Sequence, residues 1–146
     1  MSKLVLVPVD GSEHAKKALT FAIDWAQHHD GSIHVLNVPD LPSASELAFV
    51  DTYSVDVSQS MERLEAIGQD IVAEAIEIIR KAGIAEVTGT VAVGNPAHQI
   101  LDKAEALDAA LIVMGSRGMG GFRSLLVGSV SHKVMQHASC TTVVVR

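Results

Sequence analysis

The fold is indicated most clearly by the stretch Ala109-Ala-Leu-Ile-Val-Met114, which continues as Gly115-Ser-Arg-Gly-Met-Gly-Gly-Phe-Arg-Ser-Leu-Leu-Val-Gly-Ser129. Six apolar residues in a row are typical of a strand that is buried on both faces, and the residues after Gly128 have helical periodicity. The glycine-rich connection therefore joins the carboxyl end of a strand to the start of a helix. Main-chain N–H groups can converge on an anion at such a place, and a helix N-terminus also attracts negative charge. The stretch predicts a phosphate-binding site.

Two better-known phosphate-binding motifs do not fit this connection. A Walker A loop needs Lys and then Ser or Thr where Gly121 and Phe122 stand. A dinucleotide-binding fingerprint that begins at Gly118 needs a small residue at the position of Arg123, and it belongs before the first helix of its unit rather than the last. The sequence therefore predicts neither a Walker mechanism nor NAD binding.

The spacing of the connection has another precedent. Glycine, two residues, glycine, nine residues and Gly-Ser describe Gly115, Gly118, Gly128 and Ser129. This pattern resembles the nucleotide loop of the ATP-binding branch of the universal stress protein family. The resemblance spans nearly all 146 residues, because the other segments agree with it: Val5-Leu-Val-Pro-Val-Asp-Gly-Ser12, Val38, Gly94-Asn-Pro96 and Thr142-Val-Val-Val-Arg146.

Apolar periodicity along the chain predicts five strands separated by helices. Strands that are apolar on successive residues are covered on both faces, so the expected fold class is α/β, a doubly wound five-stranded parallel sheet with helices on both faces. The resemblance implies the strand order 3-2-1-4-5. A chain of 146 residues is expected to form a single domain over 1–146. The expected strands are 4–9, 33–38, 87–93, 110–114 and 141–145.

The resemblance implies an adenine-nucleotide site at the carboxyl ends of the first and fourth strands. The main chain around Val9 would lie near adenine and the Asp10 carboxylate near ribose, while Val38 would offer an apolar wall and main-chain hydrogen bonds to adenine. Met114 would cover the base or ribose. The loop glycines and Ser129 would hold the phosphates beside the helix dipole. The implied set is Pro8, Val9, Asp10, Val38, Met114, Gly115, Arg117, Gly118, Gly128, Ser129 and Val130.

Several of these residues also have a purely structural interpretation. Asp10 and Ser12 could cap the first helix, and Met114 could belong to the core. Val38 could serve packing alone. Glycines after a strand often serve tight turns. Arg117 lies between the first two motif glycines, where residue identity varies in the family, so its phosphate contact stays open.

The expected ligands are ATP and Mg²⁺. The ion is expected to enter with the nucleotide, because Mg²⁺ is usually held by phosphates, waters and one or two carboxylates, and Asp10 is the acidic residue near the site. The seven histidines have no zinc-site spacing, and no protein-held metal is expected.

Composition limits the expected partners and the expected cellular compartment. A net charge of -6 disfavours nonspecific binding to nucleic acid. No run approaches 18 apolar residues, so an integral membrane protein is not expected. The single cysteine, Cys140, and the lack of a signal-peptide pattern favour the cytoplasm.

Three classes of function remain open. The first is a regulatory protein of the universal stress type, in which the nucleotide state changes the surface offered to a partner. The second is a related adenine-nucleotide enzyme, either a slow ATPase or an adenylating enzyme. Adenylating enzymes place a Ser-Gly-Gly-type loop after strand one, where Asp10-Gly-Ser12 is too short. The third is a nucleotide-free interaction module, against which the complete motif argues.

Two segments bear on assembly. Residues 39–56 are unusually long for a connection in such a domain, and Phe49, Val50 and Tyr53 could dock on the chain itself or on a partner. The last strand, 141–145, falls at a sheet edge in the implied order and carries no proline or charge. The resemblance implies a homodimer in which the last strands of two copies run antiparallel.

Overall fold

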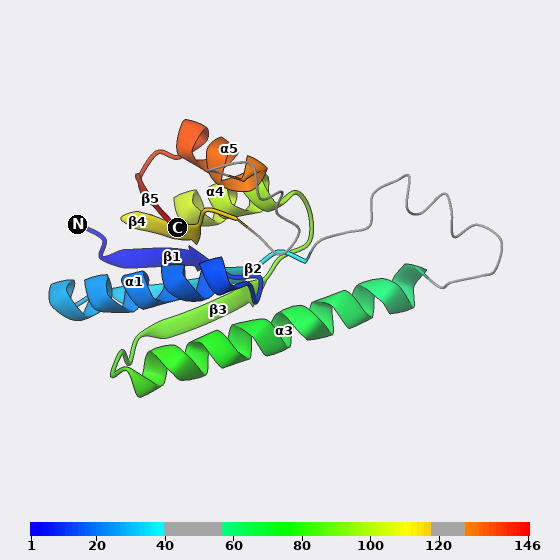
Figure 1. Cartoon of the computed structure of the whole chain (residues 1–146), viewed down its shortest axis with the longest axis horizontal. Coiled ribbons are helices and arrows are strands. Elements are labelled where there is room, and N and C mark those ends of the chain that lie inside the picture. Colours follow the sequence, from blue (N-terminus) through cyan, green and yellow to red (C-terminus); the bar gives the residue numbers. More distant parts are fainter. Residues whose placement is uncertain (40–56, 118–127) are drawn as a thin grey trace.

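The computed structural model describes residues 1–39, 57–117 and 128–146, and in it five parallel strands form one sheet (Figure 1). The strand order is β3-β2-β1-β4-β5, as predicted. Along the chain the elements are β1 (Leu4–Pro8), α1 (Glu13–His29), β2 (Ser32–Asn37), α3 (Val57–Lys81), β3 (Val87–Val91), α4 (Pro96–Ala106), β4 (Leu111–Gly115), α5 (Ser129–His137) and β5 (Thr141–Val145). The prediction of the fold class is confirmed.

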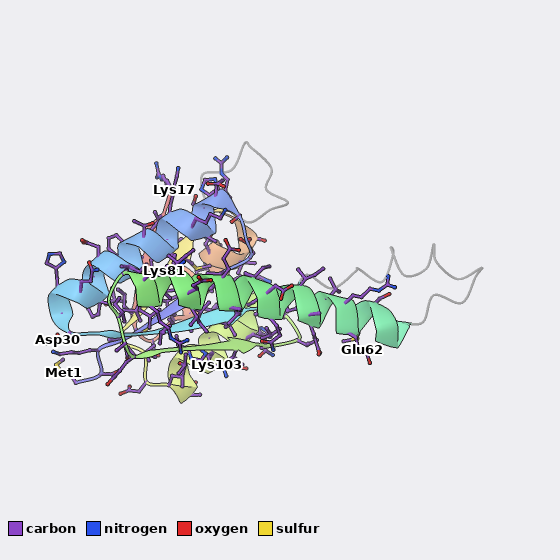
Figure 2. All side chains as sticks on the ribbon, turned by 90° about the horizontal axis from the view of Figure 1, so that it is seen from below. Met1, Lys17, Asp30, Glu62, Lys81 and Lys103 are labelled. Carbon is purple, nitrogen blue, oxygen red and sulfur yellow. The ribbon has the colours of Figure 1, made fainter. Side chains whose placement is uncertain are left out.

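Helices cover both faces of the sheet, α1 and α3 on one face and α4 and α5 on the other (Figure 1). Figure 2 shows the α1 and α3 face, with Glu62 near the beginning of α3 and Lys81 at its end. Within the described ranges, no helix has both the length and the apolar character needed to cross a membrane.

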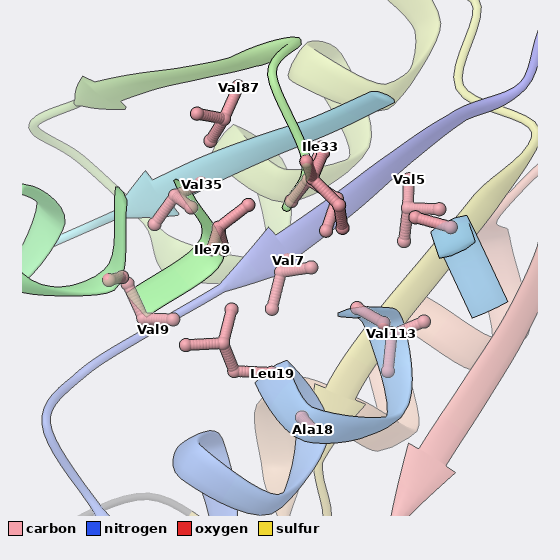
Figure 3. Close-up of a cluster of buried hydrophobic side chains, with 14 of the residues drawn as sticks. Val5, Val7, Val9, Ala18, Leu19, Ile33, Val35, Ile79, Val87 and Val113 are labelled. Atoms are coloured by element: carbon pink, nitrogen blue, oxygen red, sulfur yellow. The ribbon is translucent and has the colours of Figure 1, made fainter. Parts of the chain in front are cut away.

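The two faces explain why the central strands are apolar at successive positions. Val5, Leu6 and Val7 of β1 are all fully buried. Val5 and Val7 point into the cluster under α1 and α3 (Figure 3), whereas Leu6 belongs to the cluster under α4 and α5. Complete burial of each such side chain stabilises the fold by about 1.5–3 kcal/mol relative to exposure. The uninterrupted apolar run is therefore the signature of a sheet with two cores.

The helix α1 follows the pattern that its sequence predicts. Its buried residues recur every three or four positions, and Ser12 caps its first turn by accepting a hydrogen bond from the N–H of Ala15 at 3.2 Å. Asparagine followed by proline is a typical helix start, and α4 begins in this way: Asn95 accepts a hydrogen bond from the N–H of His98 at 3.1 Å, and Pro96 occupies the first turn. Local sequence therefore fixes where these two helices begin.

The topology defines where a ligand can bind. From β1 the chain first crosses to β2 on one side, and later it returns to add β4 on the other side of β1. In open α/β sheets, ligands bind at the carboxyl ends of the strands at such a switch point. The residues that follow β1 and β4 therefore occupy the expected place for a site.

Candidate functional site

A cleft of about 760 Å³ opens at the carboxyl ends of the central strands, between α3 on one side and α5 on the other. Its lining contains all the residues of the implied set that the structure describes; Gly118 lies outside the described residues, as does Arg123. Those that line the cleft are Pro8, Val9, Asp10, Val38, Met114, Gly115, Arg117, Gly128, Ser129 and Val130. The fold therefore brings together segments that lie far apart in the sequence.

The end of β1 is held by two hydrogen bonds to β2. The N–H of Val9 donates to the carbonyl of Leu36 at 2.8 Å, and the carbonyl of Val9 accepts from Asn37 Nδ2, also at 2.8 Å. Both the N–H and the carbonyl of Val9 are therefore hydrogen-bonded within the protein. Val9 contributes to the cleft as part of its wall. Asn37 is 3% exposed and fixes the peptide that leads into Asp10.

Asp10 supports the turn before α1 and also lines the cleft. Its Oδ1 accepts the N–H of Ser12 at 2.9 Å, which closes the turn before α1. The residue remains partly exposed and lines the cleft. The capping interpretation of the sequence is therefore correct for Ser12, while Asp10 supports the turn and still presents a carboxylate to the cleft.

Apolar side chains form one wall of the cleft. Val38 directly follows β2 and packs against the cluster that includes Met114, which is 5% exposed. Met114 thus belongs to the core and lines the cleft at the same time. Pro96 and Ile100 of α4 extend the wall, although the sequence pattern did not indicate them. Among the described residues, no main-chain hydrogen bond engages the N–H or carbonyl of Val38.

Gly115 ends β4 against the first turn of α1. A Cβ atom at this position would lie 2.7 Å from the carbonyl carbon of His14 and 2.9 Å from its oxygen. Such distances are too short for any side chain, and the neighbour is main chain that cannot swing away. Gly115 is therefore required by helix packing, which also sets where the next residues can go.

The chain returns to the same place at Gly128. The N–H of Gly128 donates to the carbonyl of Ser116 at 2.6 Å, and a Cβ on residue 128 would lie 3.1 Å from that oxygen. The N–H of Ser116 in turn donates to the carbonyl of Val145 at 2.8 Å, which ties this point to β5. Glycine at position 128 permits the close return, and its N–H is already used.

The start of α5 differs from the starts of α1 and α4. Gly128 occupies the cap position and has no side chain that could accept a hydrogen bond from the first turn. The first main-chain hydrogen bond of the helix joins the N–H of His132 to the carbonyl of Gly128 at 3.0 Å. Among the described residues, the preceding N–H groups of Ser129, Val130 and Ser131 have no hydrogen-bond partner, as is usual at a helix N-terminus, and all three residues line the cleft.

The electrostatics of the cleft follow from this helix end. An uncapped N-terminus carries a partial positive charge of about half an elementary charge. In the part of the lining that the structure describes, the formally charged side chains are Arg117 and Asp10. The described residues contain no cluster of three or more His, Cys, Asp or Glu side chains suited to hold a metal. The arrangement can accept a ligand with an anionic end at α5 and an apolar ring at Val38.

Sequence reasoning missed three buried polar residues at this site: Asn37, Ser116 and Ser131. Each is at most 3% exposed, and each lines the cleft. Ser116 and Ser131 stand one residue after Gly115 and two residues after Ser129, so proximity to the motif was a usable signal. Asn37 had a signal as well, since it is a polar residue between the apolar Leu36 and Val38.

Comparisons with known proteins agree with this arrangement. The Universal stress protein family profile matches residues 1–146. Universal stress protein YxiE of Bacillus subtilis (strain 168) is 33% identical over 151 residues, which cover 100% of both chains. Among solved structures, universal stress protein UspA from Lactobacillus plantarum has a TM-score of 0.83 at 26% identity, over 100% of this chain and 99% of that one.

A further solved relative carries a nucleotide. The universal stress protein from Archaeoglobus fulgidus in complex with dAMP has a TM-score of 0.67 at 25% identity, and the match covers 100% of this chain and 98% of that chain. The fold and the cleft define an α/β protein with a site at its topological switch point. The chain belongs to the universal stress protein family.

Proposed function

We propose that this protein binds ATP in the cleft and acts as a regulatory protein whose nucleotide state changes its interaction with a partner. The start of α5 is the main support: Gly128 supplies no side-chain cap, and the first three residues of the helix line a cleft that has an apolar wall. The other two helices that begin beside the cleft have side-chain caps, so α5 alone among these three offers its first turn to a ligand.

The ligand has an assigned orientation in this proposal. The triphosphate lies at the N–H groups that begin α5, with Arg117 and the hydroxyl of Ser129 beside it. Adenine lies against Val38 and Met114, where the main chain of Val38 can form hydrogen bonds. Ribose lies near Asp10. Mg²⁺ enters with the phosphates and takes Asp10 as its protein carboxylate.

The dAMP complex of the Archaeoglobus relative supports an adenine nucleotide as the ligand, because that relative is 25% identical to this chain over its full length. The spacing of Gly115, Gly118, Gly128 and Ser129 resembles that of the ATP-binding branch, which supports ATP within this class of ligand. Hydrolysis would require a base or a group that orients water at the γ-phosphate. Asp10 is the carboxylate in the described lining, and the proposal places it at ribose and Mg²⁺, so we assign this site to binding rather than to turnover.

Calorimetric titration of Mg·ATP into wild type, Ser129→Pro and Ser129→Ala tests the proposal. Proline is well suited to the first helical position, and Gly128 already has the extended conformation (φ −69°, ψ 163°) that a residue before proline prefers. The proline variant therefore keeps the helix and deletes one N–H donor. Because a hydrogen bond to a charged group contributes about 1.5–3 kcal/mol, affinity should fall roughly tenfold or more.

Ser129→Ala is the matched control, since it removes the hydroxyl and keeps the N–H. Its loss of affinity should be smaller than that of the proline variant. Omission of Mg²⁺ should weaken ATP binding, and Mg²⁺ without nucleotide should not bind tightly. Failure of folded wild type to bind ATP, or equal affinity of wild type and the proline variant, would contradict the proposal.

A further inference from the structure

A buried hydroxyl holds the two ends of the connection between β4 and α5. Ser131, the third residue of α5, is 2% exposed. Its Oγ lies 3.1 Å from the carbonyl oxygen of Gly128 and 3.3 Å from that of Ser116, which is fifteen residues away in the sequence. One side chain thus contacts the point where the chain leaves the sheet and the point where it enters the helix.

The Ser131 hydroxyl contacts the Ser116 carbonyl, and the Ser116 peptide groups also form main-chain hydrogen bonds. The carbonyl of Ser116 accepts the N–H of Gly128, and the N–H of Ser116 donates to Val145 of β5. A serine hydroxyl has one proton, so it is shared between the two carbonyls or alternates between them. Either way, the first turn of α5 is tied to the end of β4, which the sheet itself holds in place.

We propose that Ser131 is a positioning residue that sets the affinity of the site for the phosphate part of its ligand. The inference rests on the proposed function. The N–H groups of α5 bind phosphate only if they point to the place where the ligand's phosphates lie when its base is against Val38. The Ser131 side chain fixes that direction without itself contacting the ligand, because its hydroxyl is directed to the two carbonyls.

Removal of this hydroxyl leaves the neighbouring groups satisfied. In Ser131→Ala, the carbonyl of Gly128 still accepts the N–H of His132, and the carbonyl of Ser116 still accepts the N–H of Gly128. No buried carbonyl loses its last partner, so the variant is expected to fold. The Ser131→Ala variant therefore tests the effect of the position of α5 without disrupting the core.

The experiment compares ATP with adenosine, which lacks the phosphates, by calorimetry on wild type, Ser131→Ala and Ser131→Thr. Loss of one neutral hydrogen bond predicts ATP affinity about fivefold weaker in the alanine variant, with adenosine affinity unchanged. Ser131→Thr keeps the hydroxyl and should restore ATP affinity. Ser139→Ala is the control, because Ser139 is exposed between α5 and β5 and should behave as wild type.

A second readout needs no nucleotide. The hydrogen exchange of the Gly128 amide should be about fivefold faster in Ser131→Ala than in wild type, because its bond to Ser116 loses support. If wild type binds no ATP, the proposed function fails, and this exchange rate still decides whether Ser131 holds the helix. An unchanged rate, or equal weakening of ATP and adenosine, would overturn the positioning role.

Discussion

His34 shows how one buried side chain links neighbouring strands. Its Nδ1 lies 2.7 Å from Thr88 Oγ1, and its Nε2 lies 2.8 Å from Thr90 Oγ1, so β2 and the edge strand β3 are joined on the face under α4. Burial lowers the pKa of His34 below its ordinary value of 6.5, and the ammonium of Lys103 lowers it further. The folded protein therefore favours the neutral ring.

This shift predicts a dependence of stability on pH. As pH falls through 6.5, the unfolded chain takes up a proton at His34 before the folded chain does, so the free energy of unfolding decreases until the lowered folded pKa is passed. Chemical denaturation at a series of pH values measures this slope. His34→Gln should flatten it. A slope in His34→Gln equal to that of wild type would refute the assignment.

At the residue scale, the sequence predicted those contacts whose partners are close in the chain. Ser12 and Asn95 cap helices through an N–H three residues ahead, which a short window of sequence reveals. The partners of Asn37 and Ser131 come from other strands or from the far end of a connection. Such contacts depend on the sheet order, and for this reason local patterns could not predict them.

At the element scale, all five strands lie where apolar runs predicted them, with ends that differ by at most two residues. The third strand ends at Val91 rather than at residue 93, because the chain turns toward Asn95 and the start of α4. Phe49, Val50 and Tyr53, which could dock on the chain itself or on a partner, lie outside the described residues. Apolar periodicity locates the elements well, whereas the last paired residue is set by the neighbouring strand.

The predicted homodimer contact lies at the outer edge of β5. Among the described strands, β5 pairs with β4 on one side only. The carbonyl of Val145 accepts from Ser116, so the main-chain groups of Val145 and Val143 face β4, and those of Val144 face the open edge. We propose that two copies pair through this edge about a two-fold axis, which makes the contact closed.

Val144→Pro should therefore remove a donor from the edge and shift the dimer to monomer, while the bonds to β4 remain. Val143→Pro is the contrasting change, because it deletes a group that faces β4 and should lower the stability of the fold itself. Sedimentation at several concentrations measures the first effect, and thermal unfolding measures the second. A wild type that stays monomeric, or a dimer that Val144→Pro leaves intact, would exclude this interface.

At the scale of the whole molecule, successive apolar residues predicted a sheet with two covered faces, and the resemblance supplied the strand order. The place of the cleft then follows from topology, because β1 and β4 flank the switch point. The net charge of -6 does not indicate an anion-binding site. The positive character is local, since it arises from the helix end of α5 and from Arg117.

In the proposed complex, ATP lies at the carboxyl ends of the strands with its phosphates at α5. Amide NMR spectra recorded during a titration with Mg·ATP can detect this placement. We expect saturable shifts of the amide signals of Ser129, Val130 and Ser131, together with that of Val38. A titration that moves none of these signals would contradict it, as would shifts confined to the separate hollow on α3 around Ile76 and Arg80.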